Sequence, residues 1–385
     1  MRPLEFVGVL TVSMSVFLVM GVVTPVLPQY VRLELGGGSV AVGFVMGGFA
    51  IVALVFRPLA GSVSDRFGPG PAAGAGALVA CLSGLAYFIP GYTGVALARA
   101  SFGMGEAMMT SAAMSWAVAL APPQRRGQML AWFGLSIWAG LTIGPQIGVA
   151  LLDHGGYPAV WTFIALSPLV GGAVALSLRS GRRPLAERAE FPSLRQLVPR
   201  TVIRPGLAML LGAVGEGVLT AFVILQLADR GLGGSNPGAA GARVYTIFGL
   251  AVVVLRLLGG RITDSLGGSA AARISSGFEG LGLLLIGLAP SMAVVLTGAV
   301  TTGAGFAVLF PALALLAVNR SDERRRGATI AAFTAFYDIG FAAGGTIGGI
   351  VASFAGYRGA FFYAAAAALA INAMLGPPAR RRIAP

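Results

Sequence analysis

The sequence consists mainly of apolar stretches about 20 residues long, separated by short segments rich in charge, Gly or Pro. A helix needs about 20 apolar residues to cross the hydrocarbon core of a bilayer. Only 11% of the 385 residues are charged and the mean hydropathy is +0.83, whereas soluble proteins carry about 25% charged residues. This pattern excludes a soluble enzyme, a disordered chain and a secreted disulfide scaffold, and it predicts an all-α membrane protein.

Twelve apolar windows, bounded by charge or by Gly and Pro, predict twelve transmembrane helices. The first six are expected near residues 6–30, 40–63, 71–90, 93–120, 128–152 and 157–178. The second six are expected near residues 205–228, 240–262, 269–289, 291–318, 327–352 and 357–376. We therefore predict an N-terminal six-helix bundle at 1–178, a polar linker at 179–204, and a C-terminal six-helix bundle with a short basic tail at 205–385.

The positions of the arginines, which make up all 27 basic residues, predict the orientation in the membrane. With a cytoplasmic N-terminus, the cytoplasmic segments hold 20 arginines, the opposite segments hold 4, and Arg57, Arg99 and Arg256 lie inside spans. Cytoplasmic loops are enriched in Arg and Lys, so we expect both termini and the linker in the cytoplasm. The net charge of +13 then reflects topology and not nucleic-acid binding. The absence of Lys, with abundant Ala, Gly and Arg, fits a GC-rich prokaryote, so a bacterial plasma membrane is expected.

The two halves of the chain repeat each other at a spacing of 200 residues. Arg125-Arg126-Gly127 falls on Arg325-Arg326-Gly327, and Gly156-Tyr157 falls on Gly356-Tyr357. At a spacing of 199, residues 57–68 fall on residues 256–267. Two such repeats around a site near the bilayer midplane are typical of secondary transporters, and they predict two pseudo-symmetric bundles.

A charged glycine motif follows the second expected span. It comprises Gly61, Asp65, Arg66 and Gly68, and a degenerate copy with Asp264 follows the eighth span. Here the sequence resembles the major facilitator superfamily, whose signature in this loop ends in basic residues. A Pro-Gly-Pro segment stands in place of those basic residues. The resemblance implies a contact that is made in one conformational state and broken in another.

A second motif, in the fifth expected span, comprises Gly140, Gly144, Pro145 and Gly148. Gly at this spacing permits close helix packing, and Pro removes a backbone hydrogen bond and kinks the helix. The motif resembles one found in the antiporter branch of the same superfamily. Residues 103–106 in the fourth span and residues 131–134 in the fifth are similar to stretches of bacterial sugar-efflux permeases.

Four acids lie inside expected spans: Glu106, Glu216, Glu279 and Asp338. A charge inside a bilayer is costly and marks a functional-site hypothesis, and burial favours the neutral form of a carboxylic acid. Each of these acids could therefore bind and release a proton. The resemblance implies that Glu106, Glu216 and Asp338 line the central cavity, and we predict Glu106 as the main proton-coupling residue. Glu279 is expected to face a neighbouring helix.

Three arginines lie inside the expected spans, and the sequence predicts different roles for them. Arg99 precedes Glu106 by two helical turns, which places the two side chains on one face about 10 Å apart. The resemblance links an arginine at this place to proton movement, and a structural ion pair or a polar contact between helices is the alternative. Arg57 and Arg256 are expected to extend toward the membrane surface as structural residues.

Five aromatic residues on cavity-lining spans could form an apolar wall around a ligand, with ordinary helix packing as the alternative. They are Phe17, Trp138, Phe222, Phe310 and Tyr337. Because most of the embedded charges are acidic, a neutral or cationic substrate is favoured over an anion.

Several other activities are excluded by the residues that the chain lacks. One Cys and one His cannot form a disulfide, a metal site or a Cys/His catalytic pair, and no Gly-rich run continues into a phosphate-binding Lys-Ser/Thr. We expect no enzymatic activity and no cofactor. The sequence predicts a monomeric secondary active transporter that exports a small organic molecule, such as a drug, sugar or metabolite, in exchange for protons. The alternative is a proton-coupled importer or a facilitator.

Overall fold

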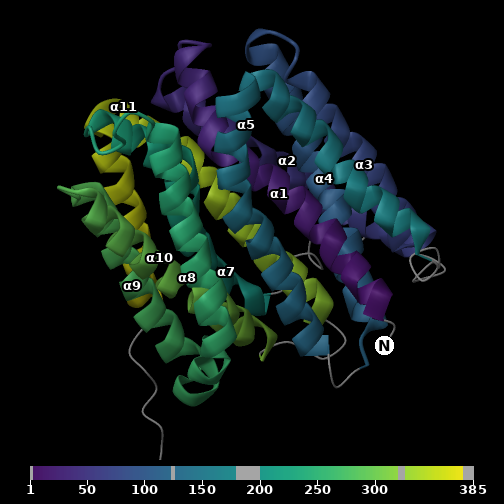
Figure 1. The fold of residues 1–385 in the computed structure, drawn as a ribbon. Helices are drawn as coiled ribbons and strands as arrows, with labels where there is room; N and C mark the ends of the chain where they lie inside the picture. The colour runs from purple at the N-terminus through teal and green to yellow at the C-terminus, as the bar shows by residue number, and fades with distance from the viewer. Residues whose placement is uncertain (1–2, 123–125, 179–199, 320–325, 376–385) are drawn as a thin grey trace, which may run out of the picture.

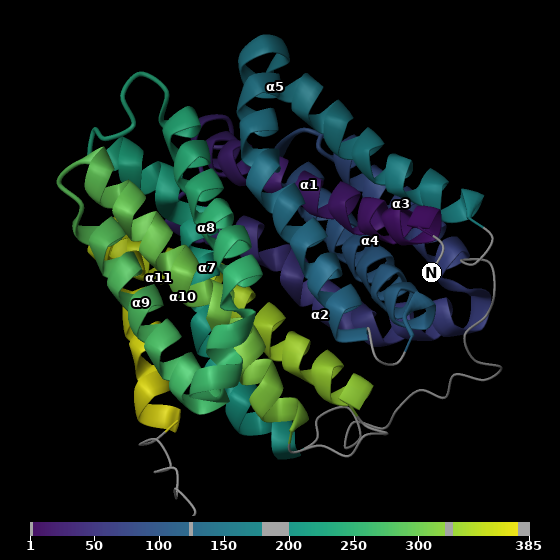
Figure 2. The ribbon, with the colours of Figure 1, turned by 60° about the horizontal axis from the view of Figure 1, so that its bottom comes forward.

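The computed structural model describes residues 3–122, 126–178, 200–319 and 326–375, and this part of the chain is almost entirely α-helical. The first half contains α1 (Pro3–Leu33), α2 (Ser39–Phe67), α3 (Pro69–Ala86), α4 (Gly91–Leu120) and α5 (Arg126–Ser177). The second half contains α7 (Arg200–Asp229), α8 (Pro237–Leu266), α9 (Gly268–Leu288), α10 (Met292–Val318) and α11 (Arg326–Leu375). The two halves form two bundles that lie side by side (Figures 1 and 2).

Two of the helices, α5 and α11, each contain two of the predicted spans. The backbone leaves the helical conformation at Gly156, with φ 63°, and at Gly356, with φ 67°. A positive φ is accessible mainly to Gly, so the repeated Gly-Tyr pair marks the same turn in both halves. The helices therefore match all twelve predicted spans. Nine helices of the described ranges are long and apolar enough to cross a membrane, and α4, which holds Arg99 and Glu106, is not among them.

The charged glycine motif lies mostly in a helix and not in a loop. We expected the second span to end near residue 63, but α2 continues to Phe67, so Asp65 and Arg66 lie in its last turn. The chain turns only at Gly68, where φ is 91°. Charged residues do not break a helix, whereas a positive φ does. In the copy, α8 likewise reaches Leu266, and the side chain of Asp264 lies outside the described part of the structure.

The predicted linker differs from the structure at its end. Residues 179–199 lie outside the described ranges, and α7 already begins at Arg200, so the last five predicted linker residues are helical. Within this first turn and a half of α7, Arg204 donates a 2.6 Å hydrogen bond to the carbonyl oxygen of Met374. This contact ties the start of α7 to the end of α11.

Glycines set the closest helix contacts within each half, as the glycine spacing predicted. A Cβ on Gly144 of α5 would lie 2.7 Å from the Cα of Gly21 in α1, and a Cβ on Gly148 would collide with a carbonyl oxygen of α1. In the second half, a Cβ on Gly217 of α7 would lie 3.0 Å from the Cα of Gly344 in α11. Only Gly fits at such backbone distances, so the two bundles use the same packing device.

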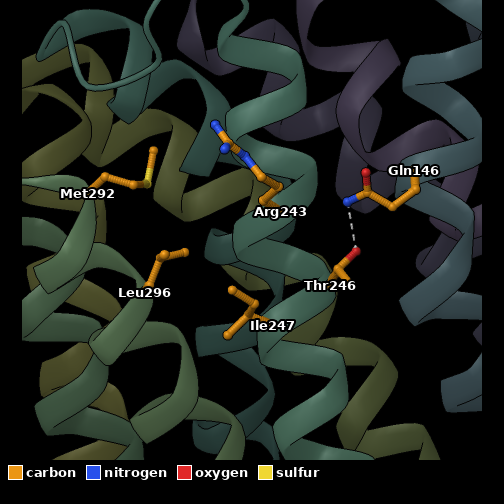
Figure 3. Close-up of a pocket in the computed structure, with 6 residues that line it drawn as sticks. All are labelled: Gln146, Arg243, Thr246, Ile247, Met292 and Leu296. Carbon is orange, nitrogen blue, oxygen red and sulfur yellow. Dashed lines mark hydrogen bonds between the residues drawn. The ribbon is translucent and has the colours of Figure 1, made fainter.

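The halves meet along two seams. In one, α2 packs on α11 through Gly43, whose Cβ would collide with the carbonyl oxygen of Gly345. In the other, α5 packs on α8, and Gln146 donates a 3.1 Å hydrogen bond to Thr246. Beside this bond lies a cavity of about 130 Å³ (Figure 3). The tight α2–α11 contact lies near the α1–α2 connection, at the end of the bundle opposite the start of α1.

Gly43→Val is expected to destabilise the protein by about 1–3 kcal/mol, the usual cost of overpacking a close contact. The added side chain would meet backbone atoms of α11, which cannot move independently of the rest of that helix. Gly48→Val on the same helix is the control, because a Cβ there has no heavy atom within 4 Å. Thermal unfolding of both variants in detergent measures the difference, and equal midpoints would contradict the close α2–α11 contact.

Candidate functional site

An ion cluster joins the two halves in the interior of the molecule. The Nε atom of Arg57 on α2 lies 2.6 Å from an oxygen of Asp338 on α11, and its Nη2 atom lies 3.1 Å from the other oxygen. The same Nη2 atom lies 3.4 Å from Glu106 on α4. The side chains of Glu106 and Asp338 are 3% and 5% exposed. A two-pronged contact of this kind is the strongest geometry for an arginine and a carboxylate.

The cluster holds one more negative charge than positive when both acids are ionised. Glu106 also accepts a 3.0 Å hydrogen bond from Thr110, so its charge is shared between two donors. Buried charges are costly unless they are paired and hydrogen-bonded. Adding one proton to either carboxylate would make the cluster neutral, so the arrangement can take up a proton without creating a new unpaired charge.

The sequence predicted that Arg57 extends toward the membrane surface, but in the structure its side chain points into the interior. Because α2 continues to Phe67, Arg57 lies ten residues inside the helix end, about 15 Å along the helix axis. From that depth its guanidinium reaches Asp338 and Glu106. Treating every charge within a span as a functional candidate would have identified Arg57 from the sequence.

Arg99 lies outside the ion cluster. Its guanidinium donates hydrogen bonds of 2.8 and 2.9 Å to the carbonyl oxygens of Val45 and Met46 on α2. It also lies 4.5 Å from the ring centre of Phe49, a cation–π contact. The structure thus gives Arg99 the polar contact between helices that was the alternative reading, and it does not bring Arg99 to Glu106.

Glu216 forms a second acidic position, which α11 connects to the ion cluster. The hydroxyl of Tyr337 donates a 2.8 Å hydrogen bond to Glu216 on α7. Tyr337 precedes Asp338 in the chain, so one helix presents neighbouring side chains to Glu216 and to Arg57. Glu216 is 1% exposed. Glu279 on α9 is also fully buried and lies against Gly215 of α7.

Arg256 on α8 lies near two aromatic rings and does not extend away from them toward the membrane surface, as the sequence had predicted. Its guanidinium carbon is 5.6 Å from the ring centre of Trp138 on α5 and 5.8 Å from that of Phe310 on α10. Trp138 in turn contacts the ring of Phe306, with 5.7 Å between ring centres. This group of rings includes side chains from both halves.

Three of the five predicted aromatic residues come together in the structure. Phe306, which the sequence did not single out, contacts both Trp138 and Tyr337, and Phe310 contacts Tyr337. Phe222 is instead fully buried and stacks on Tyr357, with 6.0 Å between ring centres. Phe17 on α1 is half-buried and makes no ring contact within the described ranges. Phe222 therefore packs inside the second half, and a ligand-binding role for Phe17 stays a prediction.

No set of three His, Cys, Asp or Glu residues in the described ranges is arranged to hold a metal ion. Two similar helical bundles with a shared interior are the architecture of many secondary transporters.

Comparison with known proteins assigns the family. The model of the Major Facilitator Superfamily matches residues 9–278 and 206–383. An uncharacterised transporter of this type from Salmonella typhimurium is 30% identical over 362 residues, covering 92% of this chain and 91% of the relative. One from Burkholderia mallei is 33% identical over 382 residues, covering 95% and 90%. The chain belongs to the major facilitator superfamily, and it is a transmembrane transport protein.

Solved structures confirm the fold. The human organic anion transporter MFSD10 (TETRAN) superposes with a TM-score of 0.74 at 17% identity, covering 97% of this chain and 99% of the other. A POT family transporter in complex with 5-aminolevulinic acid gives a TM-score of 0.79 at 15% identity, covering 95% and 94%. At such identities the similarity concerns the fold alone.

Proposed function

We propose that this protein is a proton-coupled secondary transporter that exports a small organic molecule in exchange for protons by alternating access. The observation that supports it most directly is the contact of Arg57 with Asp338 and Glu106, which joins the two halves through buried charges. In alternating access the halves rock against each other around a central site, so a contact between them must change during the cycle.

Protonation offers the means to change this contact. A proton on Asp338 would remove the negative charge that Arg57 holds across the α2–α11 seam. The interaction between the halves would then weaken, and the balance between conformations would shift. One proton that crosses an inside-negative membrane contributes about 2.3 kcal/mol per 100 mV, enough for an approximately 50-fold concentration ratio.

The direction of transport rests on the motif in α5. Gly140, Gly144 and Pro145 lie where α5 packs on α1, and the pattern resembles that of antiporters in the superfamily. We therefore propose exchange as the mode of coupling. The plasma membrane of a bacterium, with both termini in the cytoplasm, is the proposed location.

Cotransport, which would import the substrate, is the second candidate. It is favoured by Arg256, which has no carboxylate of the described residues within 4.0 Å. The negative charge of Glu216 acts on Arg256 at longer range. An anion bound at Arg256 and a proton bound at Glu216 would stabilise each other, and would then move in the same direction.

Proteoliposomes with a pH-sensitive dye in the lumen separate the two candidates. A panel of aromatic acids, sugars and organic amines is added outside, one compound at a time, under a valinomycin–potassium clamp. Exchange predicts that substrate entry makes the lumen more alkaline, whereas cotransport predicts that the lumen becomes more acidic. If no compound moves protons, both candidates are wrong.

The proposed orientation predicts opposite accessibility for two engineered cysteines. In a Cys81→Ser background, Ser193→Cys lies in the predicted linker, and Ser235→Cys lies on the exposed α7–α8 connection. A membrane-impermeant maleimide applied to intact cells is expected to label Ser235→Cys and to reach Ser193→Cys only after permeabilisation. Labelling of Ser193→Cys in intact cells would reverse the orientation.

A further inference from the structure

The two internal repeats place an arginine at corresponding positions but surround it with different chemistry. Arg57 corresponds to Arg256 at a spacing of 199 residues. Asp338 and Glu106, the partners of Arg57, correspond at a spacing of 200 to Trp138 and Phe306. At the positions where Arg57 has two carboxylates, Arg256 therefore has two aromatic residues. One of them, Trp138, lies directly beside Arg256.

Arg256 lacks a hydrogen-bonding partner within the described part of the chain. Its Nε atom is buried and makes no hydrogen bond, and no acid of the described residues lies within 4.0 Å of its guanidinium. The acid that acts on it at longer range, Glu216, accepts its hydrogen bond from Tyr337. An embedded guanidinium without an ionic or hydrogen-bonding partner is costly, and it retains free donors for a ligand.

The guanidinium of Arg256 lies at the boundary between the two halves, close to α5. The residue is only partly buried. Across the seam, Gly134 of α5 has no side chain, and a Cβ at that position would lie 3.4 Å from Nη1 of Arg256. The rings of Trp138 and Phe310 both lie near the guanidinium and supply flat apolar surfaces. A planar anionic group can pair with the guanidinium fork, and an apolar body can lie along the rings.

We propose that Arg256 binds the anionic group of the substrate, and that the substrate is an organic anion, such as a carboxylate, with an aromatic or apolar body. This inference rests on the proposed function in that the ligand is the transported molecule, and it holds for either direction of transport. It reverses the preference for a neutral or cationic substrate that the sequence suggested. The reason is that Arg57 compensates two of the embedded acids, whereas Arg256 is compensated by none at close range.

Equilibrium binding of three matched probes tests the proposal. Radiolabelled benzoate is bound to the purified full-length protein in detergent, and unlabelled benzoate, benzamide and benzylammonium compete with it. These compounds share one ring and differ in charge. We expect benzoate to bind at least about ten-fold more tightly than the other two. Similar affinities for benzoate and benzamide, or no saturable benzoate binding, would overturn the proposal.

Variants of two arginines on α8 test whether Arg256 is the residue that binds benzoate. Arg256→Gln is expected to weaken benzoate binding by about 10- to 100-fold, the range for a hydrogen bond to a charged group, and to remove the preference for the anion. Arg256→Lys should keep that preference with lower affinity. Arg243→Gln is the matched control, because Arg243 is exposed and lies 13 residues away on the same helix (Figure 3), about 20 Å along its axis. Unchanged benzoate affinity in Arg256→Gln would also overturn the proposal.

Failure of this inference can be told apart from failure of the proposed function. Binding is measured without a membrane or a gradient, so it does not depend on transport. Benzoate binding that requires Arg256, without proton movement in liposomes, would contradict the transport mechanism and leave the anion site standing. Proton movement with a neutral or cationic compound, unaffected by Arg256→Gln, would support the transport function and contradict the anion site.

Discussion

Asp338→Asn is expected to abolish the accumulation of substrate against a gradient, so that the final concentration ratio across the membrane falls to about one. Asn keeps the size of Asp and can still accept a hydrogen bond, but it cannot exchange a proton, and the only ionic contact left to Arg57 is then the longer one of 3.4 Å with Glu106. Downhill movement of substrate should persist. Uptake into proteoliposomes, with and without a pH gradient, measures both quantities.

Asp229→Asn is the matched control for this experiment. Asp229 is an exposed carboxylate at the end of α7, and its replacement should leave accumulation unchanged. If Asp338→Asn still concentrates substrate, proton coupling does not require this residue.

A double-mutant cycle shows whether the same contact holds the halves together. Arg57→Gln alone leaves two buried carboxylates near each other without their cation, an arrangement that costs about 3–5 kcal/mol in other proteins. The double variant Arg57→Gln with Asp338→Asn should recover part of this loss, with an interaction energy of about 0.5–3 kcal/mol. Unfolding of the four proteins in detergent gives the energy, and strictly additive effects would show that the pair does not stabilise this conformation.

Glu106→Gln is expected to abolish proton-driven transport and to remove the pH dependence of substrate binding, while substrate still binds. The amide of Gln can still accept the hydrogen bond from Thr110, and the 2.6 Å contact between Arg57 and Asp338 is untouched. The variant therefore removes one site for a proton and keeps the link between the halves. Binding titrations over a range of pH, together with uptake under a pH gradient, provide the measurement.

Glu34→Gln serves as the control for Glu106→Gln, because Glu34 is an exposed carboxylate just after α1. If Glu106→Gln concentrates substrate as the unmodified protein does, the coupling proton is carried elsewhere. Asp338 and then Glu216 are the next candidates, since the cluster and the hydrogen bond of Tyr337 connect them through α11. The predictions for Asp338→Asn and Glu106→Gln differ in one respect, because only Asp338→Asn is expected to loosen the α2–α11 seam.

The sequence by itself determined the helices and their two-fold repetition. Hydropathy is a local property, so each apolar stretch reports its own span, and the turns at Gly156 and Gly356 follow from a Gly-Tyr pair repeated 200 residues apart. Glycine spacing likewise predicted that α5 packs closely on another helix, because such a contact depends on which residues lack a side chain, and the structure shows that this helix is α1. The family resemblance rested on the same short motifs.

Only the tertiary structure decided which charges meet. Arg57 and Asp338 are 281 residues apart, and their contact depends on how α2 and α11 are rotated and placed, which no local pattern encodes. For the same reason Arg99 donates hydrogen bonds to backbone oxygens of α2 and does not contact Glu106, although Arg99 and Glu106 lie on the same helix. Arg57 contacts carboxylates, whereas the corresponding Arg256 contacts aromatic rings. The two surroundings differ because each arginine is contacted by a side chain from the opposite half. Helix formation depends on neighbours in the chain, whereas the candidate site depends on neighbours in space.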